Sequence, residues 1–199
     1  FPNMEAAAIP GVAVPLLQDD CADTTVDLDW VWDYIHLTSD DKTRRLDLGS
    51  LRATVDSWFT PASLELGMGT AEGDTERIAR AWLARTGKRW RPFFAVAAFQ
   101  ALREDPAAPL PEDLRKLAVA VECFHKASLI HDDIEDQSDG RRGRIAVWKV
   151  WGLAQGLNAG DGMFVLARLA LGKLHPALSV EKCVQILRTF DQATLALTE

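Results

Sequence analysis

The sequence predicts an all-α protein, and three observations support that fold class. Apolar residues recur at helical spacing through 114–134, 153–174 and 180–197, which is typical of helices that bury one face. Alternation with a period of two, which marks half-buried strands, is scarce. Breaks that contain proline or glycine, such as 105–109 and 175–176, separate the helical stretches. The length of 199 residues fits a single domain with a sizeable core.

The N-terminal region predicts an arm followed by helices. Residues 1–25 include an apolar run that is too short and too broken by proline to span a membrane, and that lacks the positive start of a signal peptide. We therefore expect an extended arm over 1–25 and a helical domain over 26–199. Within that domain, the Trp-containing stretch 26–36 is expected to serve packing, and 48–59 has helical spacing.

Charge and cysteine content narrow the class of protein. The net charge of −7 does not favour nucleic acid as a partner, so clustered basic residues need a local explanation. Cys21, Cys123 and Cys183 show no CxxC spacing, which argues against a metal–thiolate site. With no targeting or transmembrane segment in view, this cysteine usage predicts a protein of the reducing cytoplasm.

A basic segment stands between two predicted helices, 75–85 and 93–102. It reads Gly87-Lys88-Arg89-Trp90-Arg91-Pro92. Proline is favoured at the first position of a helix, so we expect a helix to begin at Pro92. Helix N-termini favour anions, and lysine and arginine both bind phosphate oxygens. Lys88 and Arg91 are therefore candidate anion-binding residues, although a basic surface loop would have the same composition.

An acidic run ends the apolar stretch 114–134. It reads His131-Asp132-Asp133-Ile134-Glu135-Asp136 and is followed by Arg141-Arg142-Gly143. Asp132 and Asp136 are four residues apart, so a helix places their carboxylates on one face, one turn apart. Mg²⁺ is usually held by one or two carboxylates together with waters and substrate phosphates. The run therefore predicts a magnesium site beside paired arginines, which suits a diphosphate. A solvated acidic helix end is the alternative.

His125 extends the same helix face. It lies seven residues before Asp132 and eleven before Asp136, or about 20° from each at roughly 100° per residue. The apolar residues around it predict a buried helix, where acids are costly unless a cation compensates them. We expect His125 to share the anion site, and a satisfied core histidine is the alternative.

These segments, together with Asn158-Ala159-Gly160-Asp161-Gly162, resemble the trans-type (E-type) polyprenyl diphosphate synthases, a family of class I isoprenoid enzymes. The matching segments occur in the family's order and spacing, and four ordered motifs are specific where any one would be weak. The resemblance covers about residues 78–199. It implies an all-α class I isoprenoid synthase helical bundle, of which this chain holds the first part.

The resemblance also implies a function and a set of roles. The chain would belong to a Mg²⁺-dependent prenyltransferase that condenses isopentenyl diphosphate with an allylic prenyl diphosphate. Asp132 and Asp136, with Asp133 nearby, would bind the Mg²⁺. Arg141 would hold the allylic diphosphate and act with Asp132 and Asp136 in catalysis. The residues implied for isopentenyl diphosphate are Lys88, Arg91, His125 and Arg142. Ionising an allylic carbon–oxygen bond requires a neutralised leaving group, which metal and arginine supply.

Two departures from the family affect these expectations. The Pro-Thr pair that often follows Arg-Arg-Gly is replaced by the Arg-Ile-Ala-Val of 144–147. The family's second aspartate-rich segment would lie beyond Glu199. We therefore expect the 199 residues alone to be inactive, with a longer protein, a partner chain or a second copy completing the fold.

Two other functions stay open from the residues. One is a non-catalytic or half-site subunit of a two-component prenyl synthase. The other is a class I terpene cyclase, which shares the aspartate-rich run but needs no isopentenyl site. Lys88, Arg91 and Arg142 argue against the cyclase.

The resemblance further suggests a product length. Ala127 and Ser128 are the fifth and fourth residues before Asp132, where the family's growing tail passes, and both are small. Phe124 lies deeper, about 12 Å along the helix from Asp132 at 1.5 Å per residue. The expected product is therefore geranylgeranyl diphosphate or longer.

Overall fold

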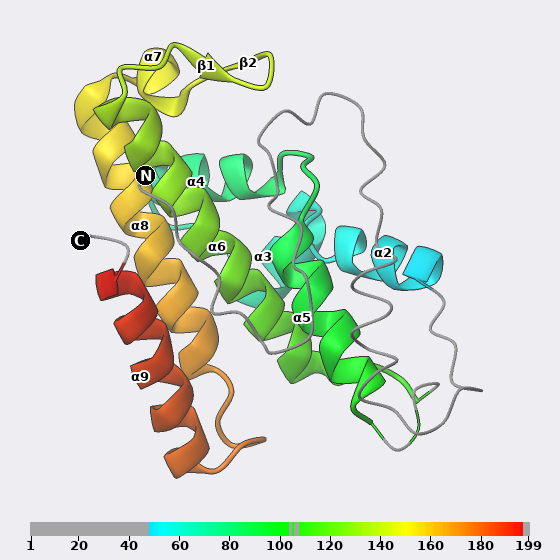
Figure 1. Cartoon of the computed structure of the whole chain (residues 1–199). Helices are drawn as coiled ribbons and strands as arrows, with labels where there is room; N and C mark the ends of the chain where they lie inside the picture. Colours follow the sequence, from blue (N-terminus) through cyan, green and yellow to red (C-terminus); the bar gives the residue numbers. More distant parts are fainter. Residues whose placement is uncertain (1–47, 104, 106–107, 197–199) are drawn as a thin grey trace, which may run out of the picture. The chain divides into compact units, whose positions relative to one another are not determined.

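The computed structural model describes residues 48–103, 105 and 108–196. The predicted arm at 1–25, the Trp-containing stretch at 26–36 and Cys21 lie outside the described residues. The helices are α2 (Leu48–Ser57), α3 (Pro61–Met68), α4 (Asp74–Ala84), α5 (Trp90–Ala101), α6 (Glu112–Glu135), α7 (Val147–Trp151), α8 (Leu153–Gly172) and α9 (Val180–Ala196). A hairpin of β1 (Gly140–Arg141) and β2 (Arg144–Ile145) stands between α6 and α7 (Figure 1).

The helices confirm the all-α prediction. The stretches predicted at 75–85, 114–134, 153–174 and 180–197 correspond to α4, α6, α8 and α9 with small shifts at their ends. None of the helices in the described ranges is long and apolar enough to cross a membrane.

The predicted start of α5 was wrong by two residues. The helix begins at Trp90, and Arg89 before it has a left-handed backbone with φ 44°, which turns the chain from α4 into α5. Pro92 is then the third helical residue. Its missing N–H costs nothing there, because N–H groups in the first turn have no partner within the helix and the first bond runs from Phe93 to Arg89.

α6 and α8 lie side by side and form the centre of the described part (Figure 1). Their close approach depends on glycines in α8. A Cβ at Gly160 would overlap the imidazole of His131 on α6, and one at Gly156 would stand 3.3 Å from the side chain of Ile134 on α6. α4 and α9 pack against α8, and α5 packs against α6.

The core is apolar, with three charged exceptions among the described residues. Its largest fully buried side chains include Phe59, Phe93, Leu83, Ile130 and Met163, and each such side chain contributes about 1.5–3 kcal/mol by leaving water. Arg89, Glu122 and Asp133 are buried with them. A buried charge is costly unless it is paired. The partners of these three residues therefore identify the polar contacts within the core.

The hairpin explains the Arg-Arg-Gly sequence locally. Arg142 and Gly143 occupy its two-residue turn with φ of 52° and 72°. Positive φ at both central residues is the type I′ turn that suits the twist of a hairpin. A Cβ at Gly140 would overlap the carbonyl oxygen of Arg144, so a glycine is required there. The turn projects Arg142 away from the strands, and its side chain is exposed.

Candidate functional site

The C-terminal end of α6 carries the predicted carboxylate pair. α6 ends at Glu135, and the backbone N–H of Asp136 still bonds to the carbonyl of Asp132 at 2.9 Å. The helical geometry that was expected for Asp132 and Asp136 is therefore present. Asp132 is half-buried and Asp136 is exposed, so both are accessible from the same side of the helix.

Asp133, which was expected near the metal ligands, is buried and paired. It is 1% exposed, and its Oδ1 accepts a hydrogen bond of 2.9 Å from Nε of Arg141. The other arm of the Arg141 guanidinium pairs with Asp132. Burial is the largest single influence on the pKa of Arg141 and lowers it. The two carboxylates together outweigh burial, so the pKa is raised. Arg141 is therefore fixed at the acidic end of α6 by a buried anchor.

Arg89 is the buried member of the basic segment. Its guanidinium donates to the carbonyls of Leu83 (3.3 Å), Ala84 (3.4 Å) and Arg85 (3.0 Å) at the end of α4. It also stacks 4.1 Å above the ring of Phe59. The last carbonyls of a helix lack partners within the helix and favour a cation. Arg89 thus caps α4, whereas Lys88 and Trp90 on either side of it are half-buried.

Arg91 and His125, which were predicted to share an anion site, are in contact. Arg91 Nη1 lies 3.1 Å from Nε2 of His125. Burial, followed by the nearby cations Arg91 and Lys126, lowers the pKa of His125 to about 3. The imidazole is therefore neutral at ordinary pH, and its Nε2 accepts the hydrogen bond from Arg91. The proton then sits on Nδ1.

The hairpin brings further cations to the same place. Arg142 and Arg141 are close enough to His125 to lower its pKa. Arg144 donates a 2.7 Å hydrogen bond to Oγ1 of Thr86, which ties the hairpin to the segment that precedes α5. The structure thus gathers Arg91, His125, Arg141 and Arg142. Lys88 is half-buried on the same segment, without a hydrogen bond or ion pair to another described residue.

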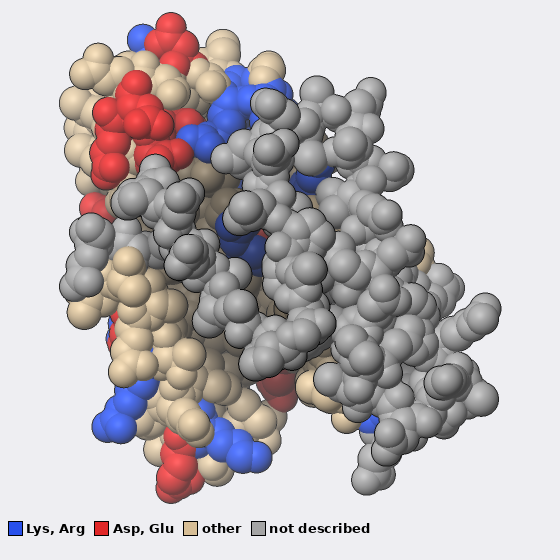
Figure 2. All heavy atoms as spheres, viewed as in Figure 1, with Lys and Arg blue, Asp and Glu red and all other residues tan. Residues whose placement is uncertain are grey.

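The charged groups are visible on the surface. In the space-filling view, acidic side chains gather where α6 meets α7, and basic side chains adjoin them on the side of the hairpin (Figure 2). Opposite charges thus stand next to each other without full pairing, because Asp136, Arg142 and Lys88 form no ion pair within the described ranges. Such an arrangement can hold a ligand that has both anionic groups and bound cations.

Sequence reasoning missed two residues of this cluster, Glu122 and Lys126. Glu122 is 2% exposed, and its Oε1 lies 3.9 Å from Nη1 of Arg89. Lys126 follows His125 and is half-buried. A signal was present, since both interrupt an otherwise apolar stretch. Their spacing of four residues also places them on one face of the helix.

The fourth sequence segment has a packing role in the structure. Gly160 permits the contact between α8 and His131, as described above, and Nε2 of His131 lies 3.4 Å from Oδ1 of Asp161. A Cβ at Gly162 would stand 3.4 Å from Thr75 on α4. The segment 158–162 therefore positions the acidic end of α6 against α8 and α4.

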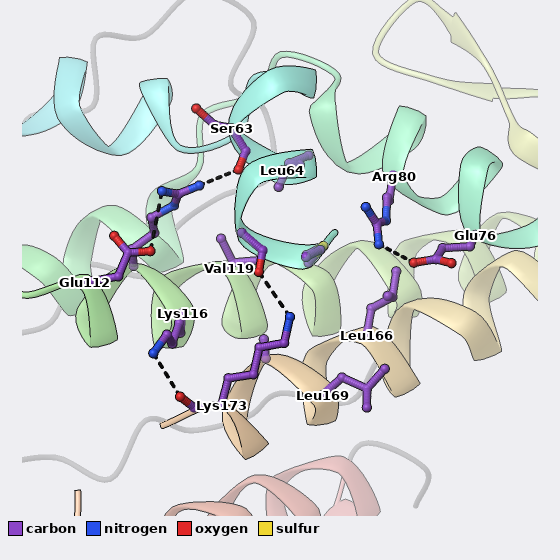
Figure 3. A pocket seen from close by; sticks show the side chains of 14 residues that line it. Ser63, Leu64, Glu76, Arg80, Glu112, Lys116, Val119, Leu166, Leu169 and Lys173 are labelled. Atoms are coloured by element: carbon purple, nitrogen blue, oxygen red, sulfur yellow. Dashed lines mark hydrogen bonds and ion pairs between the residues drawn. The ribbon is translucent and has the colours of Figure 1, made fainter. Parts of the chain in front are cut away.

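A separate cavity lies at the opposite half of α6. It has a volume of about 270 Å³ and is lined by α3, α4, α6 and α8 (Figure 3). Its charged lining is paired: Arg80 with Glu76, Lys116 with Asp113, and Lys173 with a backbone carbonyl. None of the predicted site residues lines it. The cavity is therefore distinct from the candidate site.

The donor set at Asp132 and Asp136 fits a shared magnesium ion. Across the described ranges, no three His, Cys, Asp or Glu side chains gather closely enough to bind an ion alone. Mg²⁺ commonly takes one or two carboxylates and completes its shell with water and substrate phosphates. Two accessible carboxylates one turn apart meet that need, whereas buried Asp133 does not.

Comparisons with known proteins point to one family. A family model described as polyprenyl synthetase matches residues 74–199. The (2E,6E)-farnesyl diphosphate synthase of Mycobacterium tuberculosis is 42% identical over 85 residues, which is 43% of this chain and 22% of that protein. The geranylgeranyl diphosphate synthase of Methanosarcina mazei is 40% identical over 102 residues, which is 51% of this chain and 30% of that protein.

Solved structures give the same result for the fold. A geranylgeranyl pyrophosphate synthetase from the archaeon Geoglobus acetivorans matches 74% of this chain and 45% of its own, with a TM-score of 0.62 and 26% identity. A polyprenyl synthetase from Streptomyces coelicolor matches 76% of this chain and 45% of its own, with a TM-score of 0.60 and 28% identity. The chain spans less than half the length of these proteins. On the extent of the family-model match, the chain belongs to the polyprenyl synthetase family.

Proposed function

We propose that the protein is a prenyltransferase that joins isopentenyl diphosphate to an allylic prenyl diphosphate. One observation supports this most strongly. The end of α6 carries two accessible carboxylates, Asp132 and Asp136, beside cations that lack anionic partners among the described residues, such as Arg142. The metal ions would balance the carboxylates, and the two diphosphates would balance the cations.

Each group has a chemical task in this proposal. Magnesium held by Asp132 and Asp136 would neutralise the diphosphate that leaves the allylic carbon. Arg141 adds a fixed positive charge beside them, and its anchor on Asp133 keeps it in place without reorganisation. The homoallylic double bond then attacks the allylic carbon as that carbon loses its diphosphate, and the released diphosphate would accept the proton that the new chain loses. No protein nucleophile is required.

The second diphosphate belongs to isopentenyl diphosphate. We assign it to Lys88, Arg91, His125 and Arg142. The contact of Arg91 with neutral His125 supports the assignment, because it leaves the imidazole free to donate from Nδ1 while the guanidinium keeps its other donors. Arginine offers a planar fork to phosphate oxygens and lysine a point charge.

The test is turnover of isopentenyl diphosphate and an allylic diphosphate by the full-length protein. Asp136→Asn should lower turnover about a hundredfold or more, as loss of a transition-state charge partner does. Glu112→Gln, an exposed carboxylate at the other end of α6, is the control and should leave turnover unchanged. Circular dichroism should show the same helix content in both variants.

Two results would overturn the proposal. Near-normal elongation by Asp136→Asn would remove the carboxylate pair from catalysis. Consumption of the allylic diphosphate without isopentenyl diphosphate, giving a hydrocarbon or a cyclic alcohol, would favour the cyclase.

We further propose that aromatic residues beneath the carboxylates set the product length. The ring of Phe124 lies 5.5 Å from Phe164 on α8 and 5.0 Å from Phe190 on α9, both in edge-to-face contact. Ser128 stands between Phe124 and Asp132, about 40° from each on the helix. Ala127 faces elsewhere, about 140° from Asp132, and is fully buried in packing.

This geometry changes the useful test of product length. Ala127→Phe would disturb the core, so Ser128→Phe is the better variant to shorten the product. Phe124→Ala should lengthen it. Chromatography of the dephosphorylated alcohols measures both, and an unchanged product in both variants would place the limit elsewhere.

A further inference from the structure

A second stripe of charged residues runs along α6 beside the one that holds His125, Asp132 and Asp136. Glu122, Lys126 and Asp133 are spaced by four and seven residues, so they fall within about 40° of one another. Unlike the first stripe, this one faces inward: Glu122 is 2% exposed and Asp133 is 1% exposed. Two buried carboxylates and a half-buried lysine on one face of an otherwise apolar helix call for a physical reason.

The two buried carboxylates hold arginines from two different segments. Glu122 faces Arg89 of the basic segment at 3.9 Å, and Asp133 accepts from Arg141 of the hairpin at 2.9 Å. Each acid still has one buried oxygen without a hydrogen-bond partner among the described residues, Oε2 of Glu122 and Oδ2 of Asp133. The stripe therefore fixes both arginine-bearing segments to the same helix.

Lys126 lies between these anchors and is left without one. It forms no hydrogen bond or ion pair with another described residue. Its Nζ lies 3.6 Å from the position that a Cβ of Gly87 would take, so it reaches the start of the basic segment.

The surroundings of Lys126 are predominantly positive. Burial lowers its pKa most, Glu122 partly offsets that effect, and Arg89, Arg142 and Arg144 lower it further. A half-buried ammonium beside three guanidinium groups is unfavourable without an anion to compensate it. The side chain is nevertheless held at the point where the basic segment and the hairpin approach each other.

We propose that Lys126 is a further diphosphate-binding residue, positioned to reach the same anion as Lys88, Arg91 and Arg142. The inference rests on the proposed function, since it adds a residue to that site. Lysine is a compact point charge with three donors, so it can contact one oxygen of a diphosphate while the arginines bind other oxygens. An anion there would balance the positive charge that Glu122 offsets only in part.

The experiment measures the affinity of the full chain for inorganic diphosphate by calorimetry, with a chelator present so that no metal bridges the anion. The variant is Lys126→Met, which keeps the apolar stem and removes the charge. The matched control is Lys116→Met on the same helix, whose ammonium is already paired with Asp113 at 2.7 Å. Lys126→Met should weaken binding about 10- to 100-fold. Lys116→Met should not change it, and Lys126→Arg should keep most of it.

The outcomes separate this inference from the proposed function. If Arg91→Ala weakens diphosphate binding and Lys126→Met does not, the role of Lys126 is wrong and the proposed function stands. Equal weakening of diphosphate binding by Lys126→Met and Lys116→Met would indicate an effect of net charge. That result would also overturn the role of Lys126. If the wild-type chain binds no diphosphate, both proposals fail. Thermal melts control for folding, and Lys126→Gln replaces the methionine variant if that variant melts early.

Discussion

The two halves of α6 differ in how completely their charged side chains are paired. In the N-terminal half, around the 270 Å³ cavity, the basic side chains of the lining have partners, as Lys116 has in Asp113 and Arg115 in the carbonyl of Ser63. In the C-terminal half, Lys126 has no partner within the described ranges, and nor has Asp136 at the end of the helix. The cavity is therefore the less promising site. Charged side chains that the fold leaves without partners are candidates for contact with a ligand.

The same contrast occurs within the basic segment. Arg89 is 6% exposed and bonds to carbonyls of α4, whereas Arg91 is exposed and bonds only to His125 among the described residues. Two arginines separated by one residue thus belong to different parts of the molecule. One belongs to the fold and the other to the site. Experiments on the two arginines can test this distinction.

The largest expected effect is on stability. Arg89→Ala should lower the free energy of unfolding by about 3–5 kcal/mol, because it leaves the Glu122 carboxylate buried without its closest cation. Arg91→Ala should change it by about 0.5 kcal/mol or less, as expected for a surface substitution. Urea unfolding followed by circular dichroism measures both.

A second pair of variants sharpens that result. Replacing Arg89 and Glu122 together by methionine should recover part of the loss, since a buried ion pair exchanged for apolar side chains is often neutral. If Arg89→Ala and Arg91→Ala were equally mild, Arg89 would not be a structural residue and the contrast within the segment would be wrong.

The next expected effect is on substrate affinity. Arg91→Ala should raise the KM for isopentenyl diphosphate about 10- to 100-fold, the cost of one charge-assisted contact, with a smaller change for the allylic substrate. Arg141→Lys should do the reverse, because it keeps the charge but loses the fork that spans Asp132 and Asp133. Steady-state kinetics with each substrate varied in turn measures the split.

Arg141→Ala is a poorer choice for this purpose, since it would leave Asp133 buried and unpaired. Lys116→Ala, at the other end of α6, should alter neither KM. If both substrates weakened equally in Arg91→Ala and Arg141→Lys, the assignment of the two diphosphates to separate groups of residues would be lost.

The parts of the site that lie on one helix could be predicted from the sequence. Residue spacing alone placed Asp132, Asp136 and His125 on one face, and α6 has the geometry that this required. The bounds of the long helices followed from apolar periodicity for the same reason. Within a helix, the position of a side chain depends on its number in the sequence and on little else.

Features that depend on contacts between segments could not be predicted in that way. The start of α5 at Trp90 depends on Arg89 reaching back to α4. The burial of Asp133 depends on Arg141, which arrives by a hairpin whose type I′ turn places an arginine where asparagine is preferred. The expectation that Asp133 stands with the metal ligands came from proximity in sequence, which did not reveal that Arg141 would pair with it.

The smallest expected effect is a pH dependence that His125 alone produces. Burial and the adjacent cations lower its pKa to about 3 in the folded chain, whereas histidine in an unfolded chain titrates at about 6.5. Between these values the unfolded chain binds more protons. The contribution of neutral His125 to stability is therefore complete above about pH 6.5 and is lost as the pH falls toward 3. His125→Gln keeps an acceptor for Arg91 but cannot take a proton.

Wild type should therefore lose about 1–2 kcal/mol more than His125→Gln between pH 7 and pH 4, a figure reduced because the imidazole keeps some contact with solvent. Acid effects of the carboxylates are common to both proteins and cancel in the difference. His175→Gln, an exposed histidine after α8, should follow wild type. Parallel curves for wild type and His125→Gln would mean that burial and the surrounding cations do not lower the pKa of His125. Added inorganic diphosphate should reduce the difference, because an anion beside Arg91 offsets the repulsion that keeps the imidazole neutral.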